Sequence, residues 1–260
     1  MTLLVVAVAG RGLVDPAEPV FRADDEALLR GGAAFETVRS YGGTPFLLDR
    51  HLARLRFSIE ALALPDAAGV EELVELVLGA APPDHVLRLY RTDRALVATA
   101  AALPEGLEEL RDRGLSLRAV AGAPASLLAG AKTTSYDQAF AARRAAERAG
   151  ADDALFVAGD VVLETATANI WWRRGEQVFT PAVQAGVLPG VTRELVLELT
   201  DAREGDFPVS EVAGAVEAFT TSSIREVMPV VALDGRPIGT GTPGPLAARL
   251  QAALRLRSRR

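Results

Sequence analysis

The stretch Leu188–Arg193 reads LPGVTR and leads from an irregular loop into a predicted helix at Arg193–Thr200. It places a glycine and a threonine at the helix start, where free backbone N–H groups and the positive end of the helix dipole meet. Such a start can bind an anion such as phosphate, but Thr192 can equally be an ordinary helix cap. The stretch therefore predicts a helix and only permits a phosphate site.

Strands and turns alternate on both sides of this stretch. Apolar, β-branched runs bounded by turn residues predict strands at Ser116–Ala121, Ala154–Ala158, Val161–Glu164, Ala168–Arg173, Gln177–Thr180 and around Ala215–Thr220. An irregular loop of small residues runs through Gly130, and a helix is predicted at Asp137–Ala149. The second half of the chain is therefore expected to mix helices with many short strands.

Two polar features end apolar strands in this half. Thr220–Ser223 (TTSS) supplies four hydroxyls and backbone donors, which alone is no more than a polar turn. Glu164 ends the apolar run Val161–Leu163, and most such glutamates are simply solvated. Buried beside a heterocyclic nitrogen, however, a glutamate would keep that nitrogen protonated, as a pyridine electron sink requires.

Lys132 is the only lysine among 28 basic residues. On a solvated surface lysine and arginine are nearly exchangeable, so a bias toward arginine can remove lysines almost everywhere. It cannot remove a lysine whose amine does chemistry, because a guanidinium stays protonated and is no nucleophile. The count alone leaves two readings open, a Schiff-base lysine and a chance survivor on the surface.

The first half reads as a mixed α/β unit. Strands are predicted at Leu3–Ala9, Ala33–Tyr41, Pro45–Leu48, His85–Tyr90 and Ala95–Ala101. Helical spacing of Leu52, Leu55, Ile59 and Leu62 predicts a helix that Asp49 could cap, and a second helix is expected at Glu71–Leu78. The charged stretch Leu103–Gly114 is the best candidate for an interdomain connection.

Composition excludes several classes of function. The chain has 260 residues, a formal net charge of −6 and no cysteine, so disulfides, thiol nucleophiles and Cys-zinc sites are excluded. Its two histidines are too isolated for a His-based metal site, and no metal is expected. The basic tail Arg255, Arg257, Arg259 and Arg260 reads as a solvated end, so no nucleic-acid partner is expected. No signal peptide or membrane span is predicted, which favours the cytoplasm.

Taken together, these stretches resemble the class IV aminotransferases. These enzymes depend on pyridoxal 5′-phosphate (PLP) as cofactor and include branched-chain aminotransferase, D-amino acid aminotransferase and aminodeoxychorismate lyase. The resemblance covers nearly the whole chain through Gly32–Arg39, His51–Leu55, Lys132–Thr133, Glu164–Asn169, Thr180–Pro181, Leu188–Arg193 and Pro229–Val230. The order and spacing of these segments, rather than any one of them, carry the resemblance.

The resemblance implies a role for each matching residue. Lys132 would form an aldimine with PLP and then shuttle protons, and Glu164 would bind the pyridine nitrogen. The phosphate would be bound by Arg54, Thr192 and Ser223 together with the backbone amides of Val191 and Ser222. Without the resemblance, Arg54 would be read as a helix-surface arginine.

The implied fold is mixed α/β with two domains and PLP in the cleft between them, in a homodimer. We expect a small domain at residues 1–108 and a larger PLP-binding domain at 109–260. The implied activity is transfer of the amino group of a small amino acid to a 2-oxo acid. The alternative is aminodeoxychorismate lyase, which eliminates pyruvate to give 4-aminobenzoate in the folate pathway.

Two departures from the family pattern leave the substrate open. Only Arg91–Arg94 intervenes where family members commonly carry a longer loop that often binds a substrate carboxylate, and Ser135 stands where many have asparagine. Ala168–Gly175 and Ser223–Val230 look more like the lyase, whereas the general pattern fits both activities. A PLP-binding protein with little turnover also remains open. A sugar-phosphate binder would explain the phosphate site but not the single lysine.

Overall fold

The computed structural model describes residues 2–122 and 130–259, so most of the predicted small-residue loop before Gly130 lies outside the described residues. The chain divides into two compact units. The first contains the residues up to Glu105 and the short segment Ala131–Ser135, and the second contains most of the remainder. The prediction had placed Ala131–Ser135, and therefore Lys132, in the second domain. The segment joins the first unit because its backbone pairs with the edge of that unit's sheet.

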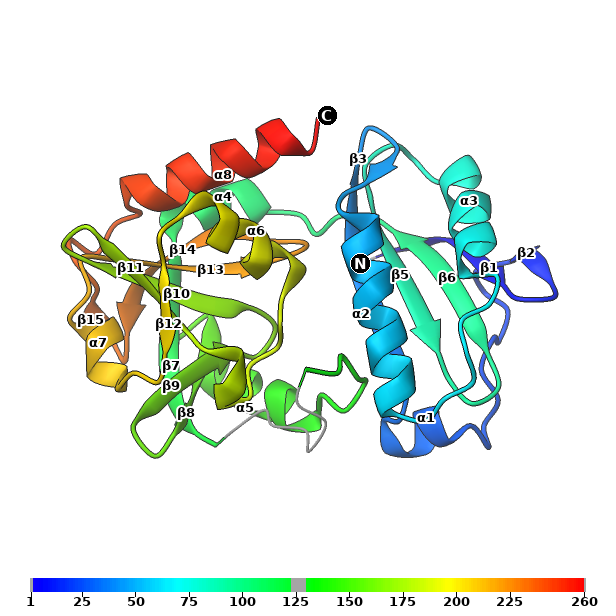
Figure 1. Cartoon of the computed structure of the whole chain (residues 1–260), viewed down its shortest axis with the longest axis horizontal. Helices are drawn as coiled ribbons and strands as arrows, with labels where there is room; N and C mark the ends of the chain where they lie inside the picture. Colours follow the sequence, from blue (N-terminus) through cyan, green and yellow to red (C-terminus); the bar gives the residue numbers. More distant parts are fainter. Residues whose placement is uncertain (1, 123–129, 260) are drawn as a thin grey trace. The chain divides into compact units, whose positions relative to one another are not determined.

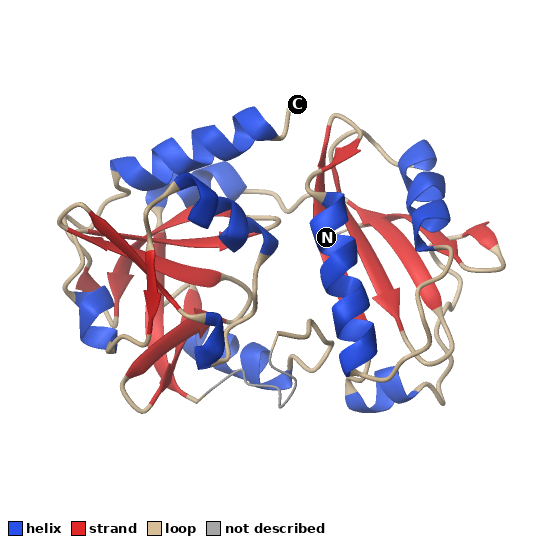
Figure 2. Ribbon diagram, in the orientation of Figure 1, coloured by secondary structure: helices blue, strands red, loops and turns tan. Residues whose placement is uncertain are grey.

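The first unit is a six-stranded antiparallel sheet with two long helices on one face (Figures 1 and 2). Its strands, in the order β2-β1-β6-β5-β3-β4, are β1 (Leu3–Val8), β2 (Gly12–Val14), β3 (Ala34–Tyr41), β4 (Thr44–Pro45), β5 (His85–Arg91) and β6 (Leu96–Ala101). Its helices are α1 (Glu26–Arg30), α2 (Leu48–Ala61) and α3 (Val70–Ala80).

The core of this unit follows the two periodicities of its sequence. Alternate residues of β3 are buried, so Ala34, Glu36, Val38 and Ser40 share one face of the sheet. On α2 the buried residues recur at helical spacing and include His51, Leu55 and Ser58. Most of the buried positions in this unit are apolar, but the polar ones on β3 and α2 place ionisable and hydroxyl groups in the core.

The second unit is built on nine strands and five helices within its described residues. Its strands are β7 (Leu115–Ala121), β8 (Asp153–Ala158), β9 (Val161–Thr165), β10 (Asn169–Arg174), β11 (Gln177–Pro181), β12 (Arg203–Gly205), β13 (Glu217–Ser222), β14 (Glu226–Leu233) and β15 (Arg236–Pro237). Its α-helices are α4 (Leu107–Arg113), α5 (Asp137–Arg148), α6 (Val191–Leu199), α7 (Val209–Ala213) and α8 (Pro245–Arg257), and a 3₁₀ turn, η1, spans Val183–Ala185.

Six of these strands close into a barrel. The order β10-β13-β14-β7-β8-β9 returns to its start because β9 also pairs with β10. That closing pair is Glu164 opposite Asn169, and Asn169 in turn lies opposite Thr221 of β13. Barrel closure therefore aligns Glu164, Asn169 and Thr221 in one row across three strands.

Several local predictions are wrong. Residues 45–48 do not form a strand, because β4 ends at Pro45 and α2 begins at Leu48; Asp49 lies in the first turn of α2 and does not cap it. The predicted connection Leu103–Gly114 does contain the boundary between the units, after Glu105, but most of it is α4 of the second unit. Arg255, expected to be solvated, bonds to the buried carboxylate of Glu226 at 2.9 Å. No helix in the described part of the chain is long and apolar enough to cross a bilayer.

Candidate functional site

Lys132 is held by its backbone against β3 and α2 of the first unit. Its N–H donates to Ser58 Oγ at 2.9 Å, and its carbonyl accepts from Phe35 N at 3.1 Å. Its Nζ lies 4.4 Å from the centroid of the Phe35 ring. Because two elements of the first unit, β3 and α2, hold the lysine backbone, its amine extends from a fixed point of a half-buried site.

Gly31 is part of what lets this segment approach. Its φ is +69°, a conformation that favours glycine, and an added Cβ would lie 2.9 Å from Ser135 Oγ. Ser135 Oγ also donates to the Gly31 carbonyl at 3.0 Å. Ser135 therefore helps to attach the lysine segment to the first unit.

A buried ionic cluster lies on the same two elements. Glu36 of β3 is fully buried and accepts from Arg54 Nε at 2.7 Å, from Arg54 Nη2 at 2.9 Å and from His51 Nδ1 at 2.7 Å. Ser58 Oγ, which accepts from Lys132, donates to the Arg54 carbonyl at 2.9 Å. The Ser58 hydroxyl therefore joins the backbone of Lys132 to the backbone of Arg54, whose side chain belongs to the cluster.

The charges of this cluster follow from its burial and its pairing. Burial raises the pKa of Glu36, but Arg54 and His51 outweigh it and hold that pKa at about 2. Burial lowers the pKa of His51, against the attraction of Glu36, and the charges of Arg54 and Lys132 lower it further. Glu36 is then an ionised acceptor and His51 is neutral, with its proton on Nδ1.

We expect the free energy of unfolding to fall as the pH is lowered from 7.5 to 3. Below about 6.5 an unfolded His51 takes up a proton that the folded form resists, and below about 4.5 an unfolded Glu36 does the same. The Glu36 contribution, complete above its unfolded pKa and lost as pH falls toward 2, amounts to about 3 kcal/mol. Urea unfolding at a series of pH values measures it. His51→Gln should flatten the curve between pH 7.5 and 5, and an unchanged curve would contradict the assignment.

In the second unit, Glu164 is held by two donors. Its Oε2 accepts from Asn169 Nδ2 at 2.9 Å and its Oε1 from the Leu188 backbone N–H at 3.1 Å. Each carboxylate oxygen thus receives a hydrogen bond, which favours the ionised form. The arrangement suits a carboxylate that pairs with a protonated ring nitrogen.

The predicted phosphate residues lie at the same end of the barrel. Gly190 precedes α6 and has no side chain with which to cap the N–H groups of Val191 and Thr192. Ser222 and Ser223 follow Thr221, the residue aligned with Asn169. Ser222 Oγ accepts from Arg225 N at 3.3 Å within the turn between β13 and β14.

The structure therefore gathers the predicted residues into two groups. Lys132 and Arg54 lie together in the first unit, whereas Glu164, Val191, Thr192, Ser222 and Ser223 lie at one end of the second unit's barrel. Glu36 and Ser58 were not among the predicted site residues. Both occupy buried positions of a regular pattern, and a polar residue on an otherwise apolar face was the signal that could have revealed them.

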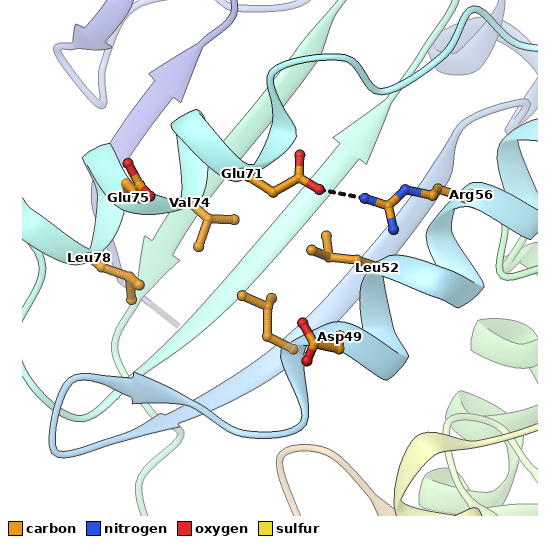
Figure 3. Close-up of a pocket in the computed structure, with 8 residues that line it drawn as sticks. Asp49, Leu52, Arg56, Glu71, Val74, Glu75 and Leu78 are labelled. Carbon is orange, nitrogen blue, oxygen red and sulfur yellow. Dashed lines mark hydrogen bonds and ion pairs between the residues drawn. The ribbon is translucent and has the colours of Figure 1, made fainter.

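A groove on the first unit contains none of these residues. It has a volume of about 310 Å³, and Leu52, Val74 and Leu78 form its apolar part between α2 and α3 (Figure 3). Arg56 and Glu71 make an ion pair across it. The groove therefore does not form part of the candidate site.

Sequence comparison decides the family. The family model "Amino-transferase class IV" matches residues 33–233. The chain belongs to the class IV aminotransferases. It is 28% identical to D-alanine aminotransferase of Bacillus licheniformis, over 93% of each chain. It is 25% identical to aminodeoxychorismate lyase of Bacillus subtilis strain 168, over 88% of this chain and 87% of the relative.

Structural comparison gives the same family. A hypothetical aminotransferase from Mycobacterium tuberculosis, in its PLP-bound form, has a TM-score of 0.87 and 25% identity, covering 97% of this chain and 98% of that chain. The predicted family and its two-domain mixed α/β fold are confirmed. PLP is the cofactor of the class IV aminotransferases.

The short loop Arg91–Arg94 of this class IV aminotransferase is anchored in its own unit. Thr92 Oγ1 donates to the buried carboxylate of Asp25 at 2.7 Å and accepts from Ala95 N at 2.9 Å. Arg91 Nε donates to the Pro65 carbonyl at 2.7 Å, and Arg94 lies 3.6 Å from Asp24. Both arginines thus have partners within the first unit.

Proposed function

We propose that the chain is a PLP-dependent aminotransferase that moves the amino group of a small amino acid to a 2-oxo acid. The observation that carries the proposal is Lys132, the only lysine, whose backbone is fixed to β3 and α2 beside a buried ionic cluster. The class IV family, whose relatives include aminotransferases of D-alanine and branched-chain amino acids, supports the activity.

The residues present fit an anionic pyridine cofactor. Glu164, whose carboxylate accepts hydrogen bonds from Asn169 and Leu188, would bind the ring nitrogen, and the uncapped start of α6 would bind the phosphate. We assign the phosphate to Thr192, Ser223 and Arg54, with the backbone N–H groups of Val191 and Ser222. Arg54 would bind it in an orientation set by Glu36, because the bidentate pair leaves the guanidinium little rotational freedom.

Each of the chain's own groups would then have a separate role. PLP supplies the electron sink that stabilises negative charge on the α-carbon of a bound amino acid. Glu164 keeps the ring nitrogen protonated, and Lys132 Nζ attaches the cofactor and is the amine that accepts and returns the α-proton. His51, neutral and bonded to Glu36, would help to orient Arg54 through that carboxylate.

Aminodeoxychorismate lyase is the second candidate function. The Bacillus subtilis lyase matches nearly the whole chain, and the local sequence around Trp171 and Ile224 resembles the lyase. The anchored loop Arg91–Arg94 also favours it, because arginines engaged within their own unit are poorly placed to bind the carboxylate of a small amino acid.

One experiment separates the two candidates. Transamination predicts that an amino donor alone, from a panel of L- and D-amino acids, converts the absorption of bound PLP to that of pyridoxamine phosphate, and that a 2-oxo acid restores it. Elimination predicts that pyruvate accumulates from aminodeoxychorismate while the PLP band is intact at the end of turnover. Pyruvate from aminodeoxychorismate, with no conversion by any amino acid, would replace the first candidate by the second.

We also propose, from the family resemblance, that the protein is a cytoplasmic homodimer. Light scattering on the purified protein would then give twice the chain mass of 27.4 kDa. A mass of one chain would contradict the dimer.

A further inference from the structure

Asn169 is the only asparagine in the chain, just as Lys132 is the only lysine. It stands directly opposite Glu164 where β9 and β10 meet. The hairpin between them is tight, since Thr165 N and Thr165 Oγ1 both donate to the Ala168 carbonyl, at 2.9 and 3.0 Å. Directly opposed residues in such a pair have their Cβ atoms about 5 Å apart, so the hairpin alone sets Asn169 beside the glutamate.

The orientation of the Asn169 amide is determined by its partners. Its Nδ2 donates to Glu164 Oε2 and to the Leu188 carbonyl, each at 2.9 Å. Two acceptors on one side require the NH₂ group there and leave Oδ1 on the other side. Asn169 is 5% exposed, so water competes little for these bonds.

Gly190 makes room for the other end of this amide. A Cβ at position 190 would overlap Asn169 Oδ1 and would lie 3.3 Å from the Cβ of Arg193. Gly190 has an ordinary extended conformation, with φ −70° and ψ 133°, so backbone geometry does not require a glycine there. The close approach of Asn169 does.

We propose that Asn169 is a positioning residue that fixes the Glu164 carboxylate, and that Gly190 lacks a side chain so that Asn169 can also hold the start of α6. This rests on the proposed function, in which Glu164 binds the ring nitrogen and α6 binds the phosphate. One amide then sets the distance between two contacts of the same rigid cofactor. Leu188 completes the link, because its N–H donates to Glu164 while its carbonyl accepts from Asn169.

The first test compares Asn169→Ala with the wild type. Loss of a charge-assisted hydrogen bond should lower kcat roughly tenfold and weaken PLP binding several-fold, because Glu164 loses the donor on its Oε2 atom. The KM of the amino donor should change by less than about threefold, since the proposed role of the amide is to hold Glu164. Thermal unfolding of the cofactor-free protein checks that both proteins are folded.

Two double variants show whether Asn169 acts through its neighbours. In a Glu164→Gln background, Asn169→Ala should lower kcat little further. If Asn169 had a purely structural role, the two fold-losses of kcat would instead multiply. In the wild-type background, Gly190→Ala should lower kcat and PLP affinity as much as Asn169→Ala does. In the Asn169→Ala background it should lower them little further, because the oxygen that the new Cβ would overlap is already gone. Gly79→Ala is the matched control, because a Cβ at position 79 of α3 meets nothing within 4 Å.

Wild-type values for PLP affinity and kcat in Asn169→Ala would overturn the inference, as would multiplied losses in the Glu164→Gln background. An equal loss from Gly190→Ala with and without Asn169 would also overturn it. Labelling of Lys132 by PLP and borohydride distinguishes a failure of this inference from a failure of the proposed function. A labelled wild type with an unaffected Asn169 variant refutes the inference alone, whereas an unlabelled wild type refutes the proposed function as well.

Discussion

Lys132→Arg is expected to abolish attachment of PLP and to lower turnover by at least about 10³-fold. A guanidinium keeps its proton at neutral pH, so it cannot attack the aldehyde of the cofactor or accept a proton from substrate. No neighbouring lysine can take over, because Lys132 is the only one in the chain. The only other primary amine is the N-terminus.

The measurement is borohydride reduction in the presence of PLP, followed by peptide mapping. In the wild type the label should lie on the peptide that contains Lys132, and in Lys132→Arg it should be absent. The variant should remain folded, because the bonds that attach this segment to Phe35 and Ser58 use the lysine backbone and not its side chain. A label confined to the N-terminal amine would refute the assignment.

Glu164→Gln is expected to keep PLP bound and to lower turnover by at least about 100-fold. A neutral amide cannot hold the ring nitrogen protonated, so the charge-assisted hydrogen bond, about 3 kcal/mol at its strongest, is lost together with the electron sink. Binding should survive because the lysine linkage and the phosphate contacts are unchanged. The glutamine also brings an NH₂ group toward donors that now serve a carboxylate, Asn169 Nδ2 and Leu188 N–H.

Absorbance titration with PLP and steady-state kinetics on the same preparation test this directly. Glu164→Asp is the matched control, because it keeps the charge and shortens the side chain by one methylene. It should retain more activity than Glu164→Gln if charge is decisive. Full activity in a folded, PLP-loaded Glu164→Gln protein would remove Glu164 from the site.

Periodic stretches were predictable because local patterns suffice to specify them. Short apolar runs between turn residues predicted β3, β5 and β6, and the helices α3 and α5 were predicted to within a few residues. The stretch at 45–48 was mistaken for a strand because four apolar residues fit a strand and a helix start equally well. Here Leu47 adopts φ 54°, and the helix begins at the next residue.

The chemically important residue types were also readable from the sequence by itself. A single lysine, an acid after an apolar strand and a Gly-Val-Thr helix start each permitted PLP chemistry, and their order along the chain indicated it through the resemblance to class IV aminotransferases. Their family order then predicted the two-domain fold, which the comparisons confirm.

Only the tertiary structure decided which residues surround them. Lys132 follows the second unit's first strand in sequence, yet its segment pairs with β3, some 100 positions earlier. Glu36 meets Arg54 and His51 because α2 packs on β3, and Asn169 meets Leu188 and Gly190 because the chain before α6 returns to the end of the β9–β10 hairpin. Patterns along a chain encode exposure and local geometry, but burial of paired charges depends on long-range packing, which no local period records.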